Sequence, residues 1–407
     1  MAGWETKPLG EVCTIKPPKA EAKKKLTGTD EVSFAPMEDL GIGVKYLQPR
    51  RTRRLDDVSG SYTYFAEGDV LLAKITPCFE NGKLGVARGL TNGVGFGSSE
   101  YIVLRPEPEL NAEFLYYYLA RPIFLEEGAR TMTGAVGHKR VTKEFVESYP
   151  IPVPPLSEQQ RVVAILDEAF EGIATAKANA EKNLQNAREL FETSLSAIFE
   201  SHLQSVFTQR GDKWVSTTIG KSCVLKSGTT VPVSIEKTSG DIPYVKVAEM
   251  TLPENQDGIT TSIRFLNRDD VKTSWLIPAG SVIFPKRGGA ILTNKKRLAL
   301  VDMCADLNIM SVIPAENLNP EFLYFYFLTV DMRKLGTGSS IPQINNYDIA
   351  PLEISFPEST RKQAEIVEFI RSLETECQAL ESVYQRKIAA LDDLKKSLLH
   401  QAFAGLL

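Results

Sequence analysis

The chain carries clusters of basic and amide side chains whose chemistry suits contact with nucleic acid. Arginine and lysine bind phosphate oxygens or guanine edges, whereas asparagine and glutamine match adenine edges. Lys74 and Lys286 recur at equivalent places in the two halves, and glycines at 137 and 338 permit close backbone approach. We therefore predict DNA-binding candidates in both halves: Lys45, Arg51, Arg53, Arg54, Lys74, Thr76, Lys83, His138, Lys139 and Arg140, then Arg264, Lys286, Arg287, Lys295, Lys296, Arg297, Ser339, Ser340, Gln343 and Asn345.

The acidic balance of the whole chain constrains this prediction. Its formal net charge is −4 and its isoelectric point is about 5.7. A protein that coats nucleic acid without further help is basic overall, so the positive charge here must be local. Partner subunits are then expected to supply part of the phosphate neutralisation. Any one basic cluster can equally be an ordinary solvated surface, and the sequence leaves that alternative open.

The sequence offers no catalytic or metal-binding set. It has three histidines and five scattered cysteines without a CxxC pair, so we expect no metal site and no disulfide framework. It also lacks the proline-rich motif of adenine methyltransferases and the GxxxxGK[ST] phosphate loop. Gly93–Gly97 superficially suggests a cofactor loop, but without a strand–loop–helix context a plain turn is favoured. These absences predict a non-enzyme with no cofactor of its own.

The location of the protein is expected to be cytoplasmic. No apolar run approaches the ~20 residues that a membrane span needs. The first ten residues have neither a basic segment nor the apolar stretch of a secretory signal. We therefore predict no membrane partner.

The two halves of the sequence repeat each other. Trp4 and Trp214 lie 210 residues apart, and similar offsets relate the aromatic segments Glu113–Tyr118 and Glu321–Tyr326. Matches continue in the same order through both halves, which indicates two homologous domains rather than a solenoid of short repeats. The aromatic segments read as short helices, and their rings are assigned to core packing in preference to a base-stacking platform.

Alternating apolar residues predict several short strands in each half. Proline-bearing strands end each globular part, because proline cannot donate to a ladder and favours edge positions. The predicted strands are 61–65, 69–73, 100–104 and 149–155 in the first half, and 274–277, 281–284, 308–313 and 352–357 in the second.

A long helix is predicted after each globular part. Capping boxes are expected at Ser157 with Gln160 and at Thr360 with Gln363. Apolar residues then recur at steps of three and four, a heptad pattern that predicts a helix pair about 65–75 Å long. The predicted contact residues of this pair, which also form the expected dock for partners, are Leu166, Ile173, Leu184, Phe191, Ile370, Leu373, Leu380, Leu391 and Leu398.

These elements predict an α+β fold built from two homologous mixed α/β domains and two long antiparallel coiled-coil helices. A pseudo-twofold axis is expected to relate the copies, and the helices would then act as a spacer between two DNA-reading domains. The predicted boundaries are 1–156 for the first domain, 157–206 for the central helix, 207–358 for the second domain and 359–407 for the last helix.

The chain resembles the specificity subunit of type I restriction-modification systems. The resemblance rests on Gly68-Asp69-Val70-Leu71-Leu72, on the Pro-Pro-Leu-Ser-Glu-Gln-Gln-Arg run at 154–161 and on the Leu-rich segment 394–406. It covers the whole chain. The second domain exit, at 356–361, departs from the usual Pro-Leu-x-Glu-Gln pattern of the family.

The resemblance implies that each domain reads one half of a bipartite target in double-stranded DNA. It also implies that the helices set the spacing and dock two adenine-methyltransferase subunits, which carry S-adenosylmethionine. Two restriction or translocase subunits can join such a complex, and the specificity subunit itself is non-catalytic. The alternatives are a coiled-coil scaffold whose two domains bind proteins, and a nuclease or methyltransferase with an unrecognised site.

Overall fold

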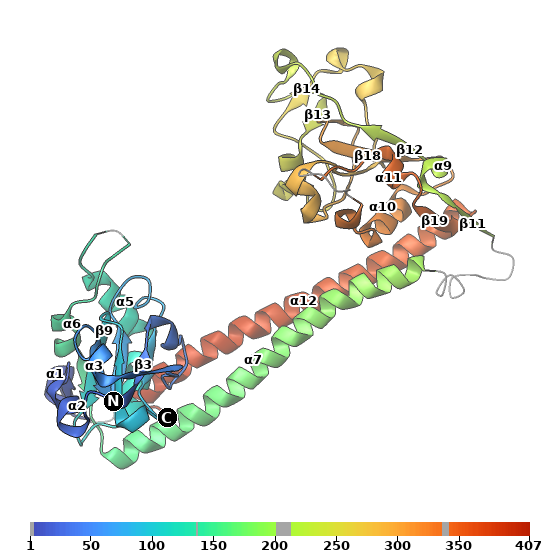
Figure 1. The fold of residues 1–407 in the computed structure, drawn as a ribbon. Helices are drawn as coiled ribbons and strands as arrows, with labels where there is room; N and C mark the ends of the chain where they lie inside the picture. Colours follow the sequence, from blue (N-terminus) through green and yellow to red (C-terminus); the bar gives the residue numbers. More distant parts are fainter. Residues whose placement is uncertain (1–3, 136, 201–212, 336–341) are drawn as a thin grey trace. The chain divides into compact units, whose positions relative to one another are not determined.

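The computed structural model describes residues 4–135, 137–200, 213–335 and 342–407 (Figure 1). The chain forms two compact units, each containing one mixed α/β domain and parts of both long helices. Unit 1 comprises residues 1–181 and 385–407, and unit 2 comprises residues 182–384. Most strands and the aromatic helices α4 and α10 follow the same order in the two units, whereas several of the short helices differ.

Unit 1 contains two four-stranded sheets and a two-stranded ribbon. The sheets have the strand orders β2-β9-β6-β7 and β4-β3-β8-β5, and β1 pairs with β10. The elements are β1 Thr6–Pro8, α1 Leu9–Val12, β2 Cys13–Ile15, α2 Ala20–Lys25, β3 Glu31–Ala35, η1 Met37–Asp39, β4 Arg51–Arg54, α3 Leu55–Val58, β5 Thr63–Ala66, β6 Val70–Ala73, β7 Leu84–Val86, η2 Thr91–Gly93, β8 Val94–Gly97, β9 Tyr101–Pro106, α4 Ala112–Leu119, α5 Pro122–Thr131, α6 Lys143–Ser148, β10 Pro150–Pro152 and the start of α7 Leu156–Phe199.

Unit 2 repeats this strand pairing, except that no described strand corresponds to β5. Its sheets have the orders β12-β18-β15-β16 and β14-β13-β17, and β11 pairs with β19. The elements are β11 Trp214–Thr218, α9 Ile219–Ser222, β12 Cys223–Ser227, η3 Val233–Ile235, β13 Ile242–Val245, η4 Val247–Thr251, η5 Pro253–Asn255, β14 Phe265–Leu266, η6 Arg268–Asp270, η7 Thr273–Trp275, β15 Val282–Pro285, η8 Gly288–Thr293, β16 Arg297–Leu298, β17 Cys304–Ala305, β18 Ile309–Pro314, α10 Pro320–Thr329, η9 Met332–Lys334, α11 Asn346–Ile349, β19 Glu353–Pro357 and the start of α12 Thr360–Phe403.

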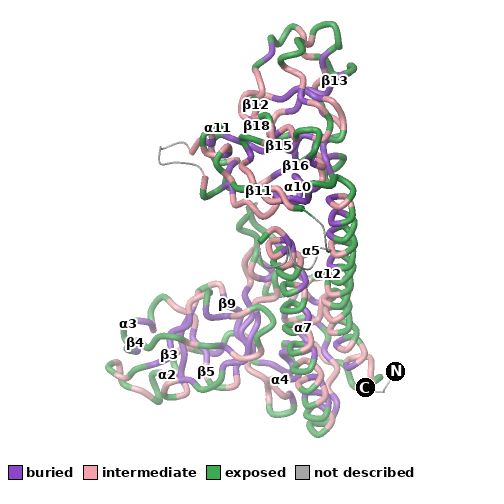
Figure 2. The backbone as a smooth tube through the Cα atoms, turned by 90° about the vertical axis from the view of Figure 1, so that its right-hand side faces the viewer, coloured by how far each residue is buried: buried purple, intermediate pink, exposed green. Residues whose placement is uncertain are grey.

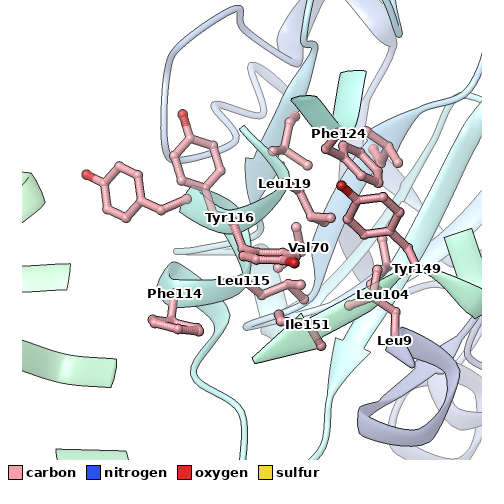
Figure 3. Packing of buried hydrophobic residues seen from close by; sticks show 14 of the residues in the cluster. Leu9, Val70, Leu104, Phe114, Leu115, Tyr116, Leu119, Phe124, Tyr149 and Ile151 are labelled. Carbon is pink, nitrogen blue, oxygen red and sulfur yellow. The ribbon is translucent and has the colours of Figure 1, made fainter. Parts of the chain in front are cut away.

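The aromatic helices α4 and α10 form the centre of each core. Phe114 and Leu115 of α4 are fully buried, and they belong to the same hydrophobic cluster as Leu104 of β9 and Ile151 of β10 (Figure 3). The corresponding Phe322 of α10 is also buried in the core of unit 2. The assignment of these rings to core packing is confirmed.

The two long helices run antiparallel where they meet inside each unit. In unit 1, Arg161 donates to the Leu407 carbonyl oxygen and Lys177 pairs with Asp392 at 2.7 Å. In unit 2, Arg188 pairs with Glu381 at 2.9 Å. Both helices show alternating buried and exposed residues along their length (Figure 2). The predicted α+β class with paired antiparallel helices is therefore confirmed.

The predicted helix caps are wrong in detail. Helix α7 already begins at Leu156, so Ser157 lies inside its first turn, and the buried glutamine there is Gln159. Gln363 of α12 does not reach back to the helix start, because its amide binds the Asn317 and Pro357 carbonyl oxygens. The six final positions of the predicted central helix, 201–206, lie outside the described residues.

Two further local predictions are corrected. Residues 274–277 form no strand: η7 occupies Thr273–Trp275, and Pro278 limits pairing to a single bridge between Ile277 and Met303. The glycine-rich segment at 93–97 is largely strand β8 rather than a plain turn. A Cβ on Gly95 would lie 2.1 Å from the Phe65 ring, so close packing of the sheet accounts for that glycine.

Candidate nucleic-acid interface

In unit 1 the structure joins two of the predicted basic segments. Lys74 follows β6, and its carbonyl oxygen accepts a hydrogen bond from the Val141 nitrogen at 2.9 Å. Thr76 donates to the Lys139 carbonyl oxygen at 2.9 Å, and Ile75 and Arg140 form an antiparallel bridge. The segments 74–76 and 139–140 therefore lie together, although more than 60 residues separate them in the sequence.

Unit 2 contains the same backbone arrangement. The Lys286 carbonyl oxygen accepts from the Ile344 nitrogen at 2.9 Å, and Gly288 donates to the Pro342 carbonyl oxygen at 2.8 Å. Arg287 and Gln343 form the antiparallel bridge. We call this arrangement the bridge site: residues 74–76 with 139–141 in unit 1, and residues 286–288 with 342–344 in unit 2.

The bridge site of unit 1 is cationic with one carboxylate. Arg140 donates from Nε and Nη2 to the two Glu100 carboxylate oxygens at 2.9 and 2.8 Å. The Lys74 Nζ donates to the Ser99 carbonyl oxygen and lies 3.9 Å from Glu100. The hydrogen bond from Arg140 holds the pKa of Glu100 below its usual value. Glu100 therefore stays ionised and fixes the arginine.

A cavity of about 510 Å³ opens beside this bridge site. The cavity is lined by Lys74, Arg140 and Tyr101, together with three basic residues that are not among the predicted candidates. These are Lys16, Lys19 and Lys143. The Lys16-Pro17-Pro18-Lys19 run was the available signal for the first two, and Lys143 follows the predicted basic loop by three residues. Five cations around one opening suit an anionic ligand such as a phosphate backbone.

The bridge site of unit 2 presents amides instead. The Gln343 Nε2 donates to the Asn345 Oδ1 at 2.6 Å, and the Asn345 Nδ2 donates to the exposed Tyr347 hydroxyl at 2.8 Å. Lys286 is buried and donates to the Ser227 Oγ at 2.6 Å. Burial and the neighbouring Arg287 lower the pKa of Lys286. Arg287 and Tyr347 are consequently the exposed groups of this site, and the amide side chains of Gln343 and Asn345 are half-buried.

The other candidates of unit 1 are not members of the bridge site, although His138 borders it, because its carbonyl oxygen accepts a hydrogen bond from Arg140. Arg51, Arg53 and Arg54 are exposed on β4, the edge of its sheet, and Arg53 lies over the Phe34 ring. Arg51 pairs with Glu38 at 3.1 Å. His138 is exposed beside Gly137, whose positive φ of 80° explains the glycine in this loop. The Lys83 Nζ donates to the Met37 carbonyl oxygen at 2.8 Å.

Lys45 is placed in an ionic network between the domain and helix α7. Its Nζ lies 2.8 Å from Glu113 and 2.7 Å from Asp167, which also accepts a short hydrogen bond from the Tyr117 hydroxyl. Burial by itself would lower the pKa of Lys45. The hydrogen bonds to Asp167 and Glu113 have the larger combined effect, so the pKa of Lys45 is raised. The side chain is only 15% exposed, so its charge is already neutralised within the protein.

The remaining candidates of unit 2 are mostly paired inside the domain. Arg264 forms ion pairs with Glu236 and the buried Glu249. Arg297 donates to the Asn255 and Lys296 carbonyl oxygens, and Lys296 is buried with its Nζ on Asn294.

Lys295 and Asn345 are the remaining described candidates of unit 2. Lys295 is half-buried, and burial lowers its pKa. Asn345 caps the short helix α11. Ser339 and Ser340 lie outside the described residues.

The predicted helix-contact residues differ in their surroundings. Leu166 and Ile370 are fully buried in the domain cores of units 1 and 2, and Ile173 is also buried. Leu380 is 42% exposed. The others are half-buried: Leu184, Phe191, Leu373, Leu391 and Leu398.

The described parts of the chain hold no group of three histidine, cysteine, aspartate or glutamate side chains that could bind a metal ion. Among the same residues, no helix is both long and apolar enough to cross a lipid bilayer.

Comparison with known proteins identifies relatives of this chain. The type I restriction-modification specificity subunit EcoEI of Escherichia coli is 37% identical over 203 residues, which cover 49% of this chain and 33% of that subunit. The chain thus spans about a third of the length of the first curated relatives that it matches.

Two solved structures share the fold. A chain from a structure on complex assembly and conformational transition of the type I R-M system is 20% identical, with a TM-score of 0.80, over 100% of this chain and 99% of that one. The HsdS subunit from Thermoanaerobacter tengcongensis is 19% identical, with a TM-score of 0.69, over 100% and 98%. The model of the type I restriction modification DNA specificity domain matches residues 1–185 and 211–390. Because these segments span most of the chain, the protein belongs to the type I restriction modification DNA specificity domain family.

Proposed function

We propose that the chain is the non-catalytic DNA-specificity subunit of a type I restriction-modification complex. The observation that carries this proposal is the bridge site, which recurs with the same backbone hydrogen bonds in both units. Each copy exposes side chains able to contact phosphates or base edges, and the side chains differ between copies. Two similar frames with different side chains suit the reading of two different half-sites.

The partners follow from this role. Double-stranded DNA with a bipartite target would be bound by both units, and the long helices would set the spacing between half-sites. The helices would also dock two methyltransferase subunits carrying S-adenosylmethionine, and two restriction or translocase subunits could join them. Such a complex would work in the cytoplasm, without a membrane partner.

Mapping methylated adenines across the genome, in cells with and without this chain, tests the proposal. The expected result is one bipartite motif that is methylated only when the chain is present. Unchanged methylation in both strains would contradict the proposal.

The alternative, a coiled-coil scaffold for proteins, is compatible with the acidic isoelectric point. It predicts that the purified complex binds DNA weakly and without a steep dependence on salt. A DNA affinity that falls steeply with rising salt, as counterion release requires, would argue against the scaffold.

A further inference from the structure

The two bridge sites differ most in one cross-strand pair. The pair is Ile75 with Arg140 in unit 1 and Arg287 with Gln343 in unit 2. On both sides of each pair the backbone hydrogen bonds are the same, so the main chain holds these positions alike in the two units. Because the backbone is held alike and the side chains differ, this pair is suited to the recognition of a different base in each half-site.

We propose that Arg140 and Gln343 determine sequence specificity, with Arg140 reading a guanine in one half-site and Gln343 reading an adenine in the other. This inference rests on the proposed function. Beyond the proposed function, the inference names the residue that contacts a base in each unit and the base that this residue prefers.

The hydrogen bonds of Arg140 leave a suitable pair of donors. Nε and Nη2 are held by Glu100, and Nη1 donates to the His138 carbonyl oxygen at 3.0 Å. One N–H remains on Nη1 and one on Nη2, because a guanidinium has five. Two such donors match the O6 and N7 acceptors of guanine in the major groove. Glu100 acts as a positioning residue, since it fixes the plane of the guanidinium.

The hydrogen bonds of Gln343 leave a different pair of groups free, one donor and one acceptor. Its Nε2 spends one N–H on Asn345, so one N–H and the Oε1 atom remain. One donor beside one acceptor matches N7 and the N6 amino group of adenine. Asn345 is itself fixed, because its Nδ2 donates to the Tyr347 hydroxyl and its backbone nitrogen donates to the Asp348 carboxylate in helix α11. Asn345 is therefore the positioning residue of unit 2.

The lysines beside these residues are poorer candidates for base reading. Lys286 is buried and bonded to Ser227, and Lys74 donates to the Ser99 carbonyl oxygen. A lysine ammonium group also lacks the two coplanar donors that an arginine offers to guanine, and it has no acceptor to place beside a donor as a glutamine does for adenine.

The test selects target sites from random duplex DNA with the full chain assembled with its methyltransferase partner. The variants are Arg140→Gln and Gln343→Arg. Each is expected to change one base position in one half-site, with a loss of discrimination of roughly 5- to 150-fold at that position. The other half-site and the spacing should stay unchanged. Matched controls are Arg333→Gln, which removes an exposed arginine paired with Asp331, and Gln256→Arg at an exposed glutamine.

The positioning residues give a second measurement. Glu100→Gln and Asn345→Ala should keep the preferred base but reduce discrimination at the same position as Arg140→Gln and Gln343→Arg, respectively. A purely structural role would lower the melting temperature without changing the ratio between bases.

Three outcomes would overturn the inference. If the parent complex selects a split motif and both variants select the same motif, the inference is wrong while the proposed function stands. If Arg140→Gln or Gln343→Arg weakens binding to all sequences equally, the residue contacts phosphate rather than a base. If the parent complex selects no split motif, the proposed function fails and this inference fails with it.

Discussion

Gln159 and Gln363 make the same three hydrogen bonds in the two units, and both are completely buried. Each Oε1 accepts from an asparagine nitrogen, of Asn111 at 2.7 Å or Asn319 at 2.6 Å. Each Nε2 donates to two carbonyl oxygens, which are those of Glu109 and Pro154 in unit 1 and of Asn317 and Pro357 in unit 2. Because those asparagines cap α4 and α10, one glutamine joins each aromatic helix to the long helix that follows it.

Replacing either glutamine by leucine should destabilise its unit by about 3 kcal/mol, since several buried polar groups lose their partner and each costs about 1–3 kcal/mol. Urea unfolding followed by circular dichroism measures this change. Hydrogen exchange at the Asn111 or Asn319 amide should accelerate in the affected unit alone. The matched control is Gln160→Ala at the exposed neighbour, which should change stability by less than about 0.5 kcal/mol. Equal effects of Gln159→Leu and Gln160→Ala would refute this account.

Lys45→Met should reduce the stability of unit 1 by about 2 kcal/mol, because Glu113 and Asp167 would be left without their shared cation in a partly buried site. Burial alone would raise the pKa of Glu113, but hydrogen bonds from Lys45 and Tyr46 lower it. The stabilisation is therefore present above the unfolded pKa of Glu113 and is lost as the pH falls through the lower folded value.

DNA binding supplies the second measurement for Lys45. The salt dependence of DNA affinity should be the same for Lys45→Met and the parent chain, because Lys45 is already neutralised by carboxylates. Lys24→Met, at an exposed position of α2, is the control for stability. A smaller salt slope in Lys45→Met would mean that Lys45 contacts phosphate after all.

Lys296→Met should stabilise unit 2. The pairing of β15 with β16 matches that of β6 with β7, so Lys296 occupies the place of the core residue Leu84. It is 3% exposed, and burial lowers its pKa to about 8. The unfolded chain then binds more protons between pH 8 and about 10.5, so stability rises with pH in this window.

Below pH 8 the full cost of burying the charge applies, and the variant should be more stable by roughly 2–3 kcal/mol at pH 7. Urea unfolding at several pH values checks this prediction. The advantage of Lys296→Met should shrink between pH 8 and 10, whereas Lys334→Met at an exposed site should show none. An advantage that stays constant over this range would show that Lys296 is not the titrating group.

Lys16→Gln and Lys143→Gln should weaken DNA binding without changing the preferred sequence. Both residues line the cavity beside the unit 1 bridge site, where phosphate contacts are expected. Each lost phosphate contact should lower the slope of log affinity against log salt by about 0.9. Fluorescence anisotropy over a salt series measures the slope, and Lys182→Gln on the exposed face of α7 is the control. Slopes equal to that of the control would exclude phosphate contact at this cavity.

The sequence by itself determined the duplication, the long helices and the buried aromatic helices. These features depend on local propensity and on periodicity, which are properties of the sequence itself. Phe114 and Phe322 recur within matched segments, and apolar residues at steps of three and four predict the helices α7 and α12. The DNA-binding role followed from family motifs rather than from the chemistry of any one cluster.

Only the tertiary structure decided which polar side chains are available. Neighbouring glutamines 159 and 160 look alike in the sequence, yet one is buried and the other exposed. Lys45 pairs with a carboxylate 122 residues away, and Arg140 meets the segment after β6 through a backbone bridge. Burial and pairing are set by contacts between distant segments, so the charge that a residue presents to DNA depends on which partners folding brings beside it.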